Sequence, residues 1–121
     1  MSALVAVGIG LLGGVGALAR FALDGGVAGR VGREFPYGTL FVNLIGAFTL
    51  GCVAGAALGP NLYRVFGTGL IGGFTTFSTW ALESHRLGED GELTLGILNF
   101  VVSLVLGVFA AWVGLQLGAW V

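Results

Sequence analysis

Long uncharged apolar stretches, separated by short polar segments, dominate the pattern of this chain. Residues 2–19, 37–58, 65–82 and 93–121 carry no charged side chain. Each stretch reaches the length of about 18 to 20 residues that an α-helix needs to cross the hydrocarbon core of a bilayer. The pattern therefore predicts an all-α integral membrane protein, with four transmembrane helices in a single domain over residues 1–121.

The segments between these stretches are short and polar. The first stretch ends at Arg20, and we expect it to run out at Asp24-Gly25-Gly26 into a loop that reaches Pro36. Gly59-Pro60-Asn61 separates the second stretch from the third. Residues 83–92 (ESHRLGEDGE) form the most polar segment, which we interpret as a solvated loop.

The third stretch has a centre that is poor helix material. Gly72 and Gly73 are adjacent, and each destabilises a helix by about 1 kcal/mol relative to alanine. Four hydroxyl residues follow within five positions, Thr75, Thr76, Ser78 and Thr79. A spanning helix is broken only where the freed backbone groups line a cavity or bind a ligand, and released carbonyls can coordinate a cation. A plain packing helix, whose hydroxyls bond back to its own carbonyls, is an open alternative.

Composition narrows the class of function. The chain is 56% hydrophobic and 9% charged, its net charge is -1, and it has no lysine. This composition is typical of integral membrane proteins and argues against nucleic acid as a partner. No spacing of metal ligands and no pairing of a nucleophile with a base is visible, so we expect no enzymatic activity.

Polar residues inside the spans are few and uncharged. Asn43 lies in the second stretch, and Asn99 and Ser103 lie four residues apart, on one face of the last. Polar groups at this depth commonly mark an ion path, although Asn43 could equally make an interhelical hydrogen bond worth about 0.6 kcal/mol. No Asp or Glu lies between residues 37 and 82 or after residue 92. The remaining groups are amides, hydroxyls and aromatic ring edges, all of which can face an anion.

Two aromatic residues and one arginine extend this set. Phe77 and Trp80 are three residues apart, so a helix that restarts after a break would place both on one side. A ring carries positive charge at its rim, although lipid or packing contact is the commoner role of such residues. Arg20 at the end of the first span either extends to the interface or raises the local anion concentration in a vestibule.

Small residues recur at the four-residue spacing of helix contacts, in the pairs Gly10 and Gly14, Gly51 and Gly55, Gly69 and Gly73, and Gly114 and Gly118. Such pairs let membrane helices approach closely. Four short spans enclose little by themselves, so we expect a homo-oligomer, most simply a twofold dimer. Arg30, Arg33 and Arg86 fall on one side of the membrane, and Arg64 with the N-terminal amine falls on the other. This bias of three positive charges against two is weak and is compatible with insertion in both orientations.

Three segments of the chain resemble the Fluc (CrcB-type) fluoride channels. They are GGVGALAR at residues 13–20, PYGTLFVN at 36–43 and GGFTTFST at 72–79. The likeness covers nearly the whole chain in order and length. It implies a multi-pass cell-membrane channel, an antiparallel dual-topology homodimer with a broken third helix, and two pores that release cytoplasmic fluoride passively.

The resemblance also implies roles for particular residues. Asn43 would be the pore asparagine, Phe77 the first aromatic residue of the family's phenylalanine pair, and Ser103 a pore-side serine. Arg20 would be the family's arginine at the end of the first span. A structural Na⁺ would be held by the backbone carbonyls of Gly72 and Thr75. Fluoride would meet hydroxyl donors at Ser78 and Thr79.

Two positions depart from the family's pattern. Trp80 stands where a second phenylalanine is usual, and its indole adds an N–H donor to the set of fluoride contacts. Asn99 stands where some members have tyrosine, and we include it among the pore residues. The alternative function is a small dual-topology proton-coupled antiporter, which would need a carboxylate within the membrane.

Overall fold

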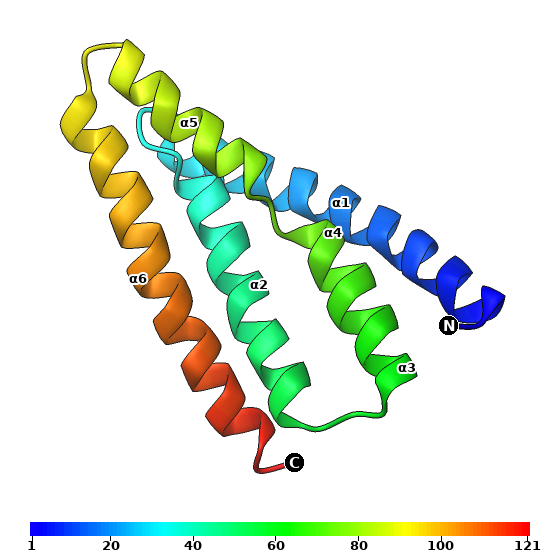
Figure 1. Ribbon diagram of the computed structural model, residues 1–121. Coiled ribbons are helices and arrows are strands. Elements are labelled where there is room, and N and C mark those ends of the chain that lie inside the picture. Colours follow the sequence, from blue (N-terminus) through cyan, green and yellow to red (C-terminus); the bar gives the residue numbers. More distant parts are fainter.

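The computed structural model describes all 121 residues, and the chain is helical almost throughout (Figure 1). Three of the helices are long and apolar enough to cross a membrane: α1 (Ala3–Val31), α2 (Tyr37–Gly55) and α6 (Leu93–Gly118). The third crossing consists of shorter pieces. A continuous helical rod joins α3 (Pro60–Leu62), the π-helical η1 (Tyr63–Ile71) and α4 (Gly72–Phe74), and α5 (Ser78–Glu89) follows it. The prediction of an all-α multi-pass membrane protein is confirmed.

The first helix is longer than expected. α1 continues beyond Arg20 and through Gly25-Gly26 to Val31, so the predicted loop is reduced to the residues just before α2. Residues 21–31 contain no proline, and glycine weakens a helix without ending it. The helix ends at Gly32, where φ is 82° and the N–H donates to the Ala28 carbonyl. Arg20 therefore lies within α1 and not at its end.

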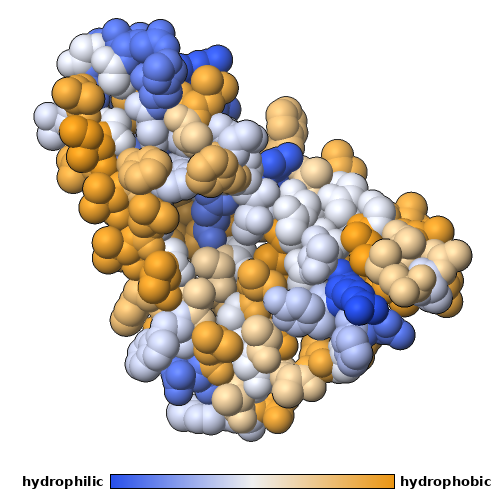
Figure 2. Space-filling view, in the orientation of Figure 1, coloured by the Kyte–Doolittle hydropathy of each residue, from blue (hydrophilic) through white to orange (hydrophobic).

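The segment 83–92 is also helical in its larger part, so the expectation of a solvated loop there is wrong. α5 extends to Glu89, and Gly91, with φ of 82°, makes the turn into α6. Polar residues on the outer face of a helix are compatible with helical geometry. Figure 2 shows a cluster of hydrophilic residues at the end where α5 meets α6, whereas hydrophobic residues cover the flank of α6.

The third crossing is broken, as expected, and the break lies just after the glycine pair, at Thr75. Gly72 has helical φ and ψ of -60° and -39°, and the chain becomes extended at Thr75, with ψ of 161°. Gly73 serves close packing instead, because a Cβ there would collide with the backbone of Gly13 on α1. Among the hydroxyls, Thr75 does bond back to the Ile71 carbonyl, at 3.2 Å.

Glycines also bring α2 and α6 together along their length (Figure 1). A Cβ on Gly51 would collide with the Ala111 carbonyl oxygen, and one on Gly114 with the Phe48 carbonyl oxygen. With the contacts of Gly69 and Gly73 against α1, three of the four predicted glycine pairs show the expected close backbone approach. The pair Gly10 and Gly14 has no neighbour within 4 Å.

We therefore predict that Gly114→Ala destabilises the helix pair, by about 1–3 kcal/mol as for other overpacked sites. Gly107→Ala is the matched control, because it lies on the same helix with no atom within 4 Å of a new Cβ. Thermal unfolding in detergent should show a lower melting temperature for the first variant only. Equal melting temperatures would mean that α2 and α6 do not meet at this glycine.

Candidate functional site

Asn43 on α2 holds the break in the third crossing open. Its Nδ2 donates to the Thr76 carbonyl at 2.8 Å, and its Oδ1 accepts from the Thr76 N–H at 2.9 Å. A continuous helix would direct that N–H at the Gly72 carbonyl. The amide therefore replaces, for one residue, the backbone partners that the break removes. One of the two Nδ2 hydrogens stays available after this pairing.

Thr76 then starts the helix on the other side of the break. Its hydroxyl oxygen accepts the N–H of Thr79, at 3.2 Å, in the first turn of α5. A side-chain oxygen in this role satisfies one of the N–H groups that a helix N-terminus leaves unpaired. Asn43 and Thr76 together fix where α4 stops and where α5 begins.

The break leaves backbone carbonyls without donors. No N–H or side chain bonds to the carbonyl oxygen of Gly72, Gly73, Phe74 or Thr75. Gly72 is also exposed on this chain. Unpaired carbonyls within a membrane crossing need a partner, and oxygen atoms of this kind suit a hard cation.

A cavity of 330 Å³ lies beside the break, and five of the predicted site residues line it: Asn43, Thr75, Phe77, Trp80 and Ser103. The expectation that Phe77 and Trp80 lie on one side is confirmed, because their rings meet edge to face with centroids 5.2 Å apart. In an edge-to-face pair the electropositive rim of one ring points at the electron-rich face of the other. Phe77 is 71% exposed on this single chain.

Trp80 is almost completely enclosed and its N–H is not free. The indole stacks on Phe100, with centroids 4.7 Å apart, and its Nε1 donates to the Asn99 carbonyl oxygen at 3.3 Å. The idea that this N–H adds a donor for an anion is wrong for this geometry. Asn99 is 1% exposed and lies behind the wall, since it lines none of the cavities described here.

A second cavity, of 160 Å³, lies on the other side of Thr76 and contains Arg20. Its wall also includes Asp24, Thr39 and Thr79, so it combines one cationic and one acidic side chain with hydroxyl groups. Thr76 lines both cavities. The clamp formed by the paired Asn43 and Thr76 therefore lies between a compartment that contains Arg20 and Asp24 and one that contains the rings of Phe77 and Trp80.

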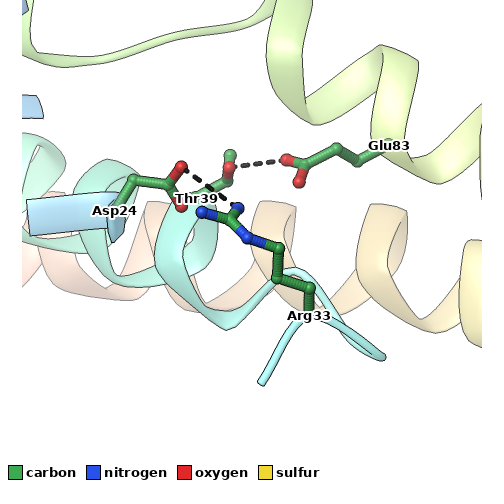
Figure 3. Close-up of polar contacts among 4 residues, drawn as sticks. All are labelled: Asp24, Arg33, Thr39 and Glu83. Carbon is green, nitrogen blue, oxygen red and sulfur yellow. Dashed lines mark hydrogen bonds and ion pairs between the residues drawn. The ribbon is translucent and has the colours of Figure 1, made fainter. Parts of the chain in front are cut away.

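A third cavity, of 590 Å³, lies at the polar end of the molecule and shares Asp24 with the second. Here the Thr39 hydroxyl donates to Glu83, and Arg33 lies 3.8 Å from Asp24 (Figure 3). Glu83 follows the apolar stretch that ends at Leu82. Burial raises the pKa of Glu83 above its usual value, against the lowering effect of the Thr39 hydrogen bond. The three cavities share walls in series, from the polar end to Asn43.

The sequence reasoning identified some of these residues and missed others. Of the predicted residues, Ser78 is exposed and lines none of these cavities. Thr76, which pairs with Asn43, was not singled out, nor was the contact between Thr39 and Glu83. Thr39 lies one turn before Asn43 on α2. No pattern in the sequence reports that its hydroxyl turns to another helix.

Comparisons with known proteins agree with this geometry. The chain matches the family described as "CrcB-like protein, Camphor Resistance (CrcB)" over residues 7–115. It is 52% identical over 111 residues to a protein of Mycolicibacterium paratuberculosis named "Fluoride-specific ion channel FluC 2", with 92% of this chain and 91% of the relative covered. It is 46% identical over 113 residues to "Fluoride-specific ion channel FluC" of Citrifermentans bemidjiense, with 89% and 91% covered.

Proposed function

The chain belongs to the CrcB family, and from that premise we propose that it is a fluoride channel that releases cytoplasmic fluoride passively. The observation that carries this proposal is the series of three cavities that leads from a polar end, past Arg20, to Asn43 and Phe77. The relatives are named as ion channels and not as enzymes, so the expectation of a non-enzymatic protein is confirmed.

Fluoride is a small, hard acceptor that must exchange its water for other donors along its path. Arg20 attracts the anion into the second cavity, where the Thr79 hydroxyl faces it. The free N–H of Asn43 and the rim of Phe77 receive it beyond the break. Each contact is of moderate strength, and a channel needs several moderate sites rather than one tight one.

The unpaired carbonyls at the break fit the Na⁺ that the family resemblance implies. Gly72 and Thr75 would hold the ion, since their carbonyl oxygens accept no hydrogen bond. The ion would supply positive charge at the break and compensate for the missing donors. The role of the chain is to keep these oxygens free, which Asn43 does by taking the Thr76 N–H.

We further propose that two copies assemble in antiparallel orientation. Gly72 and Phe77 are both exposed on one chain, although each carries a group that the function needs sheltered from lipid. A second copy across a twofold axis would cover both and would bring two sets of carbonyls together. Two pores per dimer follow from this symmetry.

The experiment is fluoride efflux from liposomes that contain the protein, recorded with and without a pH gradient. A channel moves fluoride at the same initial rate in both cases. The alternative, a proton-coupled antiporter, would use a titratable carboxylate such as the half-buried Glu83, and its rate would follow the gradient. A rate that changes severalfold with the gradient would support the antiporter instead.

A further inference from the structure

Four side chains between α5 and α6 form a hydrogen-bonded cluster that the proposed path does not use. The Ser84 hydroxyl donates to the Trp80 main-chain carbonyl at 2.9 Å, and Asn99 Nδ2 donates to Ser84 Oγ at 2.7 Å. Ser103 Oγ lies 3.4 Å from Asn99 Oδ1. Only Trp80 and Ser103 reach the 330 Å³ cavity, and Ser84 and Asn99 lie behind them.

The direction of every bond in this cluster follows from its first member. A carbonyl oxygen only accepts, so Ser84 must give its single hydrogen to Trp80. The Ser84 oxygen can then only accept, which places the NH₂ group of Asn99 toward it. The carbonyl end of the Asn99 amide therefore faces Ser103, and Ser103 must be the donor.

This direction matters for an anion in the cavity. The Ser103 hydrogen is turned toward Asn99, and an oxygen lone pair is left on the cavity side. The bond of 3.4 Å is long and therefore weak. An anion can recruit the hydroxyl, but only by taking it from Asn99. The Trp80 N–H is held in the same way by the Asn99 main-chain carbonyl, at 3.3 Å.

We propose that Asn99 is a positioning residue that holds back the hydroxyl hydrogen of Ser103 and so keeps the binding of the permeating anion weak. This inference rests on the proposed function and deepens it. Asn99 itself does not touch the anion. Its amide, oriented by Ser84, sets how strongly the cavity wall can bind, which decides how fast an ion leaves.

The test is fluoride efflux measured over a range of fluoride concentrations. In Asn99→Leu, the Ser103 hydroxyl loses the competing acceptor of the Asn99 side chain and turns to the anion. The fluoride concentration that gives half the maximal efflux rate should therefore fall roughly tenfold, as expected when one hydroxyl donor is released to a charge. Ser84→Ala should act in the same direction. Without Ser84, the Asn99 amide can turn its NH₂ group toward Ser103, and the Ser103 hydrogen is then free for the anion. Ser84 itself does not line the cavity, so it can act only through Asn99.

Ser103→Ala supplies the decisive control. When Ser103→Ala is combined with Asn99→Leu or Ser84→Ala, the half-saturating fluoride concentration should equal that of Ser103→Ala alone, because the Ser103 hydroxyl that those variants release is absent. A purely structural Asn99 would instead lower the maximal rate, and adding Ser103→Ala would lower it further. That result overturns the inference, as does unchanged half-saturation in Ser84→Ala. If the unmodified chain passes fluoride in these assays, the proposed function stands in either case, whereas no flux at all overturns both.

Discussion

Asn43→Ala is expected to reduce fluoride efflux from liposomes by about ten- to a hundredfold while the protein still assembles. The substitution leaves both the Thr76 N–H and its carbonyl unpaired beside the break. Leaving buried polar groups unpaired costs about 1–3 kcal/mol each, so the N–H returns to the Gly72 carbonyl and the broken conformation loses population. The variant also removes the free amide hydrogen from the cavity wall. Efflux is read with a fluoride electrode, and assembly by size-exclusion chromatography.

Asn61→Ala is the matched control, because Asn61 is an exposed asparagine at the start of the same helical rod. Its efflux should equal that of the unmodified protein. If Asn43→Ala also conducts at the original rate, neither the clamp nor the amide donor takes part in permeation.

Phe77→Ile is expected to lower efflux at least about tenfold, since the aliphatic side chain fills similar space but lacks the electropositive ring rim. Phe77 precedes the first turn of α5 and lines the same cavity as Asn43. No hydrogen bond of its side chain is lost, so the folded state should persist. Initial efflux rates at equal protein density give the measurement.

Phe109→Ile separates the loss of the rim from the general loss of an aromatic side chain in the membrane. Phe109 is an exposed phenylalanine on α6 and stacks on Trp112, away from the cavities. We expect unchanged efflux there. If Phe109→Ile and Phe77→Ile lowered the efflux rate equally, the rim of the Phe77 ring would have no specific role in permeation.

The sequence predicts the crossings well, because each is a charge-free stretch of the length that a bilayer imposes. It also predicts that the third crossing is interrupted. It leaves the exact residue of the interruption open, because propensity marks Gly72 and Gly73 together with the hydroxyl residues that follow them. The tertiary contact of Gly73 with Gly13 keeps that pair helical, and the Asn43 amide opens the chain at Thr75 and Thr76.

The candidate site is predictable where residues share one helix turn and not where they meet across helices. The spacing of Phe77 and Trp80, and of Asn99 and Ser103, correctly places each pair together. The destination of the Trp80 N–H depends on how α5 packs against α6. Glu83 was assigned to a loop by its polar neighbours, and its contact with Thr39 is visible only once α5 is folded against α2.

The central claim is that the cavities around the Asn43 clamp conduct fluoride. The most direct measurement uses liposomes that contain the unmodified protein, loaded with equal concentrations of fluoride or chloride, with valinomycin added to balance charge with K⁺. We predict prompt release of fluoride and far slower release of chloride. Fluoride release no faster than from protein-free liposomes, or chloride release at the same rate as fluoride, would contradict the account.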